Sequence, residues 1–356
     1  MNHFNKLDFT NQPIYIGLDV HKKSWSVSIY SQHCEHKTFT QPPQVDKLVT
    51  YLRRTFPGAT YQSVYEAGFS GFWIHDQLEQ QGIHCMVVNP ADIPTKDKEK
   101  ATKTDQVDCR KLARSLRNCE LEGIYVPSRI KVEDRSLVRT RQSMVRKQTR
   151  CKNQIKSILS FYGIPIPEEM ENRRWSKRFI NFIEQIRMEK TSGDFALKAH
   201  LDELLHLRGI IARLNKAITQ LAKTEQYYDQ VKLLKTIPGI STLTAMILLT
   251  ELSEISRFKT LDKLASYVGL IPKTHASGEK QQQTALTKRR NSQLRALLIE
   301  SSWIAVRKDP ALMFSFNRLS ARMKKTKAII PIARKLLNRI RYVLKNQKPY
   351  LTSVVE

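Results

Sequence analysis

The stretch that decides the fold is residues 14–30, IYIGLDVHKKSWSVSIY. Its first half is a short apolar run rich in β-branched and aromatic residues, which predicts a strand buried on both faces. Its second half alternates apolar and small polar residues, so we expect an antiparallel partner strand after a turn at residues 21–23. Asp19 therefore lies where a central strand ends. Because burying an unpaired carboxylate is costly, Asp19 is interpreted either as a metal ligand or as an acid that caps the turn.

Strands and helices alternate from this hairpin as far as residue 126. We expect further strands near residues 36–40, 62–66 and 83–88, and helices over residues 45–55, after the turn at residues 68–71, and over residues 104–117, the last preceded by a lysine-rich connector at residues 96–103. The alternation predicts an α/β layer with a partly parallel sheet. The strand at residues 62–66, like the first, ends in an acid, Glu66.

From about residue 131 the chain changes to long helices. Apolar residues from Leu137 to Tyr162 recur at helical spacing, and a second stripe runs over residues 195–231. Two such helices are expected to pair as an antiparallel coiled coil. The first helix carries many cations, which indicate a phosphate-facing surface or, alternatively, a merely solvated face. The proposed nucleic-acid contacts are Arg139, Arg146, Lys147, Arg150 and Lys156.

The last third is expected to be helical. Residues 233–252 read as a short helix, a Pro-Gly turn and an apolar helix, which is typical of a helix-hairpin-helix or of a plain corner between two helices. Helices are expected over residues 261–268, 292–306 and 310–344, with an irregular loop at residues 269–278. The fold class is therefore α/β plus all-α. We expect domains at residues 1–128, 129–232 and 233–356.

Charge and composition indicate a polyanionic partner. The 356 residues carry a formal net charge of +27, and the chain shows neither a membrane-spanning apolar run nor the core of a signal peptide. A basic chain of this kind most often binds nucleic acid, and we expect it in the bacterial cytoplasm, with the nucleoid. The five cysteines form no C-x-x-C pair and have no zinc-like spacing to His75, His84 or His206. They are interpreted as reduced thiols without structural zinc.

Asp105 and Asp108 complete a set of four acids. Their spacing places both carboxylates on one helix face, about 5–6 Å apart at Cβ, where they repel unless a cation lies between them. The alternative is that both simply favour the N-terminal end of their helix. Together with Asp19 and Glu66, they predict a site for Mg²⁺, which prefers oxygen ligands and suits phosphate substrates. In a basic protein this argues for cutting or rejoining nucleic-acid strands.

The motifs, in order, are GLDVHK, YEAG and KTDQVDCRKLA, then TIPGIS, RFKTLDKLASYVGLIP, SG and NSQLRALLIESSW. This series resembles the DEDD-type insertion-sequence transposases of the IS-one-ten family over nearly the whole chain. The resemblance implies a RuvC-like (RNase H-like) N-terminal domain, a coiled coil and a C-terminal transposase domain. It also implies a recombinase guided by a structured non-coding (bridge) RNA that pairs with donor and target DNA, dependence on Mg²⁺, and a homotetramer.

Carried over by position, the resemblance makes Asp19, Glu66, Asp105 and Asp108 the metal-binding acids. It makes Ser277 the nucleophile that attacks DNA and forms a phosphoserine link. Because the acids and the serine belong to different domains, it implies a composite site, in which another subunit can supply the serine. Gly278, beside this serine, would allow DNA to approach closely.

Two departures from the family pattern concern geometry near the proposed nucleophile. Glu279 stands where a small residue is expected, and Arg290 stands where the family usually has glycine. Ser241 is a rival to Ser277, but we interpret it as a helix N-cap after the Pro-Gly turn. Two other functions remain open: a metal-dependent, junction-resolving nuclease that uses the acids without a covalent intermediate, and a non-enzymatic nucleic-acid binder.

Overall fold

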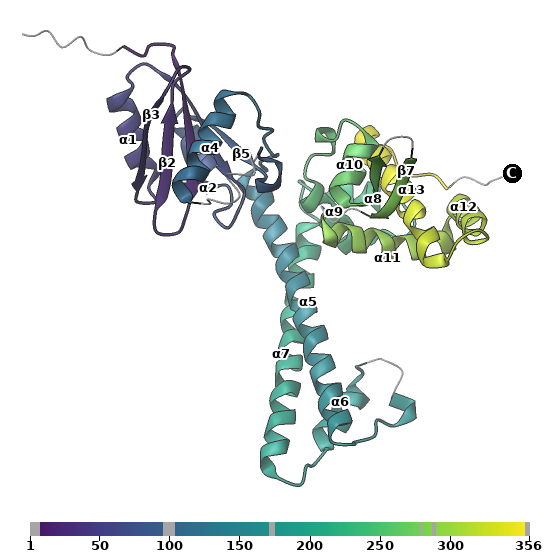
Figure 1. Ribbon diagram of the computed structural model, residues 1–356. Helices are drawn as coiled ribbons and strands as arrows, with labels where there is room; N and C mark the ends of the chain where they lie inside the picture. The colour runs from purple at the N-terminus through teal and green to yellow at the C-terminus, as the bar shows by residue number, and fades with distance from the viewer. Residues whose placement is uncertain (1–7, 95–103, 171–174, 278–279, 287–289, 353–356) are drawn as a thin grey trace, which may run out of the picture. The chain divides into compact units, whose positions relative to one another are not determined.

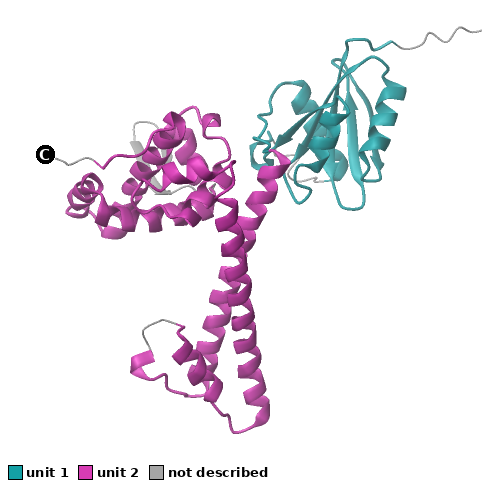
Figure 2. Cartoon of the chain, turned by 180° about the vertical axis from the view of Figure 1, so that it is seen from behind, with its two compact units in different colours: residues 1–127 teal, residues 128–356 magenta. Residues whose placement is uncertain are grey.

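The computed structural model describes residues 8–94, 104–170, 175–277, 280–286 and 290–352, but not the side chains of residues 272–286. The chain divides into two compact units, residues 1–127 and 128–356 (Figure 2). The second unit contains both regions that the sequence suggested as separate domains, so a boundary near residue 232 stays a prediction. None of the helices in the described part combines the length and apolar character needed to cross a bilayer.

Unit 1 is a mixed sheet covered by helices on both faces. Its elements are β1 (Pro13–Val20), β2 (Trp25–Tyr30), β3 (Glu35–Gln41), α1 (Val45–Thr55), β4 (Thr60–Glu66), α2 (Trp73–Gln80), β5 (His84–Val88), the short helix η1 (Pro90–Asp92) and α4 (Asp105–Arg117) (Figure 1). The strand order is β3-β2-β1-β4-β5. The β1–β2 and β2–β3 pairs are antiparallel, whereas β1–β4 and β4–β5 are parallel. The α/β layer and its partly parallel sheet are confirmed.

The two faces of this sheet have separate cores. Ile14, Ile16 and Leu18 of β1 pack on one face with apolar residues of α1 and α2. Tyr15 of β1 packs on the other face, with Leu112 of α4. The run that opens β1 is therefore buried on both sides, as a central strand requires. The lysine-rich connector expected at residues 96–103 lies outside the described residues.

The described part of unit 2 is helical apart from one hairpin. Its elements are α5 (Arg129–Phe161), η2 (Glu168–Met170), α6 (Lys177–Gln185), α7 (Thr191–Leu221), α8 (Tyr228–Leu234), α9 (Thr242–Leu252), η3 (Ile255–Arg257), α10 (Leu261–Val268), β6 (Pro272–Ser277), β7 (Lys280–Leu286), α11 (Ser292–Lys308), α12 (Pro310–Ser320) and α13 (Lys325–Asn346). Helices α5 and α7 run side by side over much of their length, and α6 packs near the ends that face away from α9 (Figure 1). The remaining helices form the largest core of the protein.

Four expectations about unit 2 are wrong. The helix expected over residues 195–231 is two helices, because the chain makes successive turns between α7 and α8, with Thr224 Oγ1 donating to the Leu221 carbonyl. The helix expected over residues 310–344 is also two, α12 and α13. The irregular loop expected at residues 269–278 is mostly strand β6, which pairs with β7 in antiparallel register. Tyr162, expected in the apolar seam of α5, is 57% exposed.

Candidate metal centre and nucleic-acid surface

Asp19 and Glu66 lie at the same edge and on the same face of the sheet. Their strands β1 and β4 are parallel neighbours paired through Leu18 and Tyr65, so the two acids follow at the next position of each strand. Leu18 and Tyr65 both pack in the core on the α1/α2 face. Because successive side chains of a strand point to opposite faces, both acids point to the face that α4 covers.

Gly17 allows α4 to lie directly on β1. A Cβ atom at this position would lie 2.1 Å from the carbonyl oxygen of Cys109 and 2.5 Å from the amide nitrogen of Ala113. The helix begins beside the edge that carries Asp19, after Thr104, whose Oγ1 accepts a hydrogen bond from the Val107 amide at 3.3 Å. A hydroxyl at the N-cap fixes where a helix starts. The close packing and the cap together bring the first turn of α4 to the end of β1.

Asp19, Asp105 and His21 form a cluster at this point. The Nε2 atom of His21 lies 3.3 Å from Oδ2 of Asp19 and 3.5 Å from Oδ1 of Asp105. One ligand atom from each of the three residues lies within 4.8 Å of the others. His21 belongs to the turn between β1 and β2, so one strand end, one turn and one helix start supply the cluster. Sequence reasoning placed His21 in that turn but missed its contact with the acids.

The cluster favours a cation. Burial raises the pKa of the Asp19 carboxyl, and the charges of Asp105 and Asp108 raise it further, whereas His21 acts in the opposite direction. A raised pKa means that the surroundings disfavour the Asp19 carboxylate when no cation is bound. Carboxylate oxygens and an imidazole nitrogen can all bind a divalent metal ion. The residues therefore fit a metal centre.

The four predicted acids differ in their surroundings. Asp105 is exposed to solvent, with 62% of its side chain accessible. Asp108 is mostly covered and accepts a hydrogen bond from the largely buried ammonium of Lys111 at 3.1 Å. The structure thus brings Asp19 and Asp105 together. It places Asp108 one helical turn along and close enough for its charge to act on Asp19, and it places Glu66 at the neighbouring strand end.

Exposed aromatic and cationic side chains border the same edge. Phe69, in the turn after β4, is 63% exposed, and the Lys22 ammonium lies 6.0 Å from the centre of its ring. Trp73, at the start of α2, is 43% exposed and packs against the buried Trp25. Exposed rings beside cations are suited to stack on nucleobases whose phosphates the cations attract.

Ser277 is the last residue of β6 and pairs with Lys280 of β7. A strand end next to a two-residue connection leaves its backbone at the tip of the hairpin. The rival serine has the role that we expected, because Ser241 Oγ accepts a hydrogen bond from the Thr244 amide at 3.1 Å and caps α9. Ser241 is therefore a helix cap, as predicted.

Arg139 makes an ion pair within the protein. Its guanidinium donates two hydrogen bonds to the fully buried carboxylate of Glu251 in α9, at 2.6 and 2.8 Å, and Asn291 donates a third at 2.8 Å. A bidentate guanidinium–carboxylate pair of this kind fixes the position of the guanidinium. The structure thus gives Arg139 a part in joining α5 to α9, and its contact with a nucleic-acid phosphate stays a prediction.

The other proposed phosphate contacts lie farther along α5. Arg146, Lys147 and Arg150 are exposed, and Lys156 is partly exposed. Among the described residues, none of these four side chains forms an ion pair with an acid. This stretch of α5, residues 146–156, is called the basic segment below.

Two family models match the chain. The model described as the Transposase IS116/IS110/IS902 family matches residues 231–316, and an IS110-type DEDD transposase model matches residues 16–164. The second match spans both strands and the helix that carry the four acids. The 16–164 match covers most of unit 1 and helix α5 of unit 2, whereas the 231–316 match lies within unit 2.

Individual relatives agree with these matches. The chain is 28% identical to y4qE of Sinorhizobium fredii, over 67% of this chain and only 57% of the relative, and 27% identical to y4rJ of the same organism, over 91% and 90%; both relatives are named as transposases. It is 25% identical to the transposase for insertion sequence element IS1533 of Leptospira borgpetersenii, over 68% of this chain and 70% of the relative. The chain belongs to the IS110 (IS-one-ten) family of insertion-sequence transposases.

Proposed function

We propose that the protein is an RNA-guided DNA recombinase that moves its insertion sequence through a metal centre and a serine nucleophile. The observation that carries the proposal is the cluster of Asp19, His21 and Asp105 on a sheet that the IS110-type DEDD model matches. The strand order, with acids at the ends of β1 and β4 and a helix bearing two more, supports an RNase H-like, RuvC-like domain.

Asp19, Glu66, Asp105 and Asp108 would hold Mg²⁺. When bound, Mg²⁺ neutralises phosphate oxygens and stabilises the charge that develops during phosphoryl transfer. Several residues of the chain position the carboxylates for such an ion. The β1 and β4 ends fix two carboxylates on a rigid sheet, α4 adds the other two, and Lys111 offsets the charge of Asp108. His21, which contacts Asp19 and Asp105, orients both carboxylates.

Ser277 is the proposed nucleophile. Its Oγ attacks a DNA phosphorus atom, so that an O–P bond to the serine forms while the bond from phosphorus to one DNA oxygen breaks. The serine proton leaves, and the departing DNA oxygen takes up a proton to become a hydroxyl. A hydroxyl of a second DNA end then reverses the step and releases Ser277. The energy of the broken phosphodiester bond is thereby kept in the phosphoserine link. A nuclease that transfers the phosphate to water would lose this energy.

The basic segment is the proposed contact to nucleic-acid phosphates. Arg146, Lys147, Arg150 and Lys156 lie on about three turns of one helix, which suits the backbone of a duplex. If a guide RNA pairs with DNA, the protein needs to read duplex shape and backbone more than base edges. We propose that α5 and α7 form an antiparallel coiled coil, that the α8–α9 turn acts as a helix-hairpin-helix, and that the protein works as a homotetramer with bridge RNA and both DNAs.

The test uses protein purified with its bound RNA, which is sequenced and then supplied with matching DNA and Mg²⁺. We expect one structured RNA species, Mg²⁺-dependent cleavage, and a covalent protein–DNA adduct that survives denaturation. The variant Ser277→Ala should form no adduct, whereas Ser241→Ala, which removes only a helix cap, should still form it. Cleavage of branched DNA without an adduct, at equal rates in the wild type and in Ser277→Ala, would establish a junction-resolving nuclease instead.

A further inference from the structure

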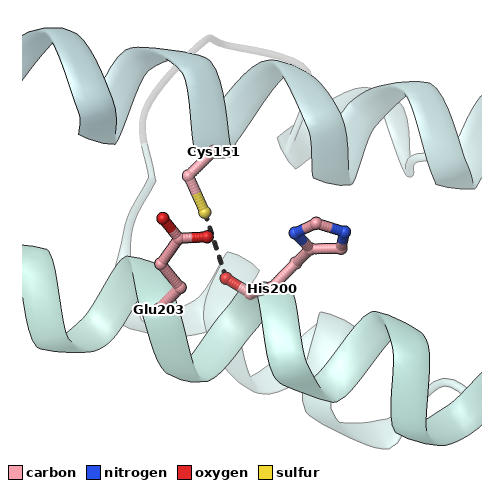
Figure 3. A group of neighbouring side chains, drawn as sticks. All are labelled: Cys151, His200 and Glu203. Carbon is pink, nitrogen blue, oxygen red and sulfur yellow. Dashed lines mark hydrogen bonds between the residues drawn. The ribbon is translucent and has the colours of Figure 1, made fainter.

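A second group of metal-ligating side chains lies between α5 and α7, in the other unit from the acids. Cys151 comes from α5, and His200 and Glu203 come from α7, three residues apart on one helix face (Figure 3). A ligand atom from each lies within 4.8 Å of the other two. Facing helices commonly build metal sites from such inward-pointing side chains.

The three side chains converge on one point. In Figure 3 the Cys151 thiol points from its helix toward α7, with the Glu203 carboxylate beside it and the His200 ring to one side. Cys151 is only 1% exposed and lies in an apolar core with Leu197, Leu201 and Leu204. His200 is partly exposed and Glu203 is exposed, so the group opens to solvent on one side. A cation could therefore enter without unfolding the helix pair.

The electrostatics of the group are unfavourable for a free thiolate. Burial raises the pKa of the Cys151 thiol, and the neighbouring charge of Glu203 raises it further. The thiol stays protonated, and its S–H group donates a hydrogen bond to the backbone carbonyl of His200, 3.1 Å away. A divalent cation would favour the deprotonated thiolate instead, because it would attract both the sulfur and the carboxylate.

We propose that Cys151, His200 and Glu203 bind a Zn²⁺-like divalent cation that holds α5 against α7. Sulfur and imidazole ligands favour zinc over magnesium, and a tetrahedral zinc with bonds of about 2.0–2.3 Å separates its ligand atoms by roughly 3.3–3.8 Å. Because the ligand atoms already lie within 4.8 Å of one another, small side-chain rotations would bring them to this separation. On binding, the Cys151 proton is released to solvent and a sulfur–metal bond forms, with water completing the coordination.

The site would fix the packing at the α6 end of the helix pair. Cys151 belongs to the same core as Phe179, Ile180 and Ile183 of α6, so a metal there stabilises the region where α6 meets both long helices. This proposal replaces the sequence expectation of no structural zinc, which compared the cysteines with His75, His84 and His206 and not with His200. The sequence gives no zinc-like spacing for this site, because Cys151 and His200 are 49 residues apart along the chain.

The experiment titrates the full-length, metal-free protein with Co²⁺, in excess Mg²⁺ so that the acidic residues of unit 1 are occupied. We expect one Co²⁺ per chain with a thiolate-to-cobalt charge-transfer absorbance, which Zn²⁺ displaces. The matched control is Cys119→Ser, which alters an exposed cysteine and should keep the absorbance, whereas Cys151→Ser should lose it. No thiolate absorbance in the wild type, or an absorbance that survives Cys151→Ser, would overturn the proposal.

A second variant guards against loss of folding. Glu203→Gln changes an exposed side chain and should leave the circular dichroism spectrum unchanged. We expect it to weaken Co²⁺ binding at least tenfold and to reduce the rise in melting temperature that Zn²⁺ produces in the wild type. Equal Co²⁺ affinity in Glu203→Gln and the wild type would contradict the assignment of this ligand set.

Discussion

The α-carbon of Gly17 lies so close to Cys109 that a Cβ atom there would be 2.1 Å from the Cys109 carbonyl oxygen. This contact sets the distance between the central strand and the helix that carries Asp105 and Asp108. The metal centre therefore depends on a residue that offers it no ligand. Gly17, the glycine of the GLDVHK motif, is therefore needed for the close packing of α4 on β1.

Gly17→Ala should destabilise unit 1 by about 3 kcal/mol or more, because neither the helix backbone nor the strand can shift without disturbing the core. Hydrogen exchange of the β1 and β4 amides would measure the loss. Gly68→Ala is the matched control, since the nearest atom to its added Cβ lies 3.9 Å away. Equal protection in both variants would show that α4 can move off β1 at little cost.

Asp19→Asn should lower the rate of DNA cleavage by on the order of 100-fold or more and yet stabilise the metal-free protein. The pKa of Asp19 is raised in the folded state, chiefly by burial, so its ionisation above the ordinary value of about 3.9 costs stability. We expect the wild type to lose stability relative to Asp19→Asn as the pH rises from about 4 to 7. Unfolding in urea with a chelator measures both proteins, and a less stable Asn variant at pH 7 would contradict the account.

Glu251→Ala should cost roughly 3 kcal/mol, because it leaves the Arg139 and Asn291 donors without their buried partner. Glu254→Ala is the control, since Glu254 also pairs with α5, through Lys131, but is 53% exposed; an exposed pair contributes about 0–1 kcal/mol. Urea unfolding of both variants gives the difference. Similar losses would show that the buried pair does little to join α5 to α9.

The Glu251 pair should also weaken in acid. Burial by itself would raise the pKa of Glu251, but the hydrogen bond and charge of Arg139, with Arg135 and Asn291, outweigh burial and hold it below its ordinary value. The pair's contribution to the free energy of unfolding is therefore fully present above about pH 4.3, the ordinary pKa of a glutamate. It is lost as the pH falls through the lower pKa that Glu251 has in the folded protein. In Glu251→Gln this acid-dependent part of the unfolding free energy should disappear.

Arg146→Ala and Arg150→Ala should each flatten the salt dependence of nucleic-acid affinity by about one unit of slope. The measurement is the dissociation constant for duplex DNA over a series of salt concentrations. Lys198→Ala, which removes one exposed charge from α7, should leave the slope unchanged. An unchanged slope in both arginine variants would show that the basic segment does not contact the phosphates.

The periodicity of apolar residues predicted the elements of unit 1 well. Each strand and helix there has a distinct spacing of apolar residues and is followed by residues that end it. Val45–Thr55 begins and ends where the pattern indicates, with Pro57 and Gly58 after it. The shared position of Asp19 and Glu66 could be anticipated for the same reason, since parallel strands place their carboxyl ends at one edge. His21 could have been found from the same argument, because a turn that follows Asp19 by two residues stays beside it.

Contacts between distant segments were not predictable in this way. Arg139 resembles its cationic neighbours on α5 until Glu251, 112 residues later, is seen to face it. The break between α12 and α13 falls at residues 321–324, which contain neither proline nor glycine, whereas Pro331 lies inside α13. The β6–β7 hairpin was missed because its polar strands lack the alternation that identifies a half-buried strand.

A divalent ion shared by Asp19 and Asp105 is the central feature of the proposed site, and iron-directed backbone cleavage tests for it most directly. Fe²⁺ in place of Mg²⁺, with ascorbate and peroxide, generates hydroxyl radicals that cut the chain next to the bound ion. We predict cuts near residues 19, 66 and 105–108 that disappear in Asp19→Asn and are suppressed by excess Mg²⁺. Cuts at these positions that persist in Asp19→Asn and Asp105→Asn, or a wild type with no cuts there, would contradict a shared metal centre.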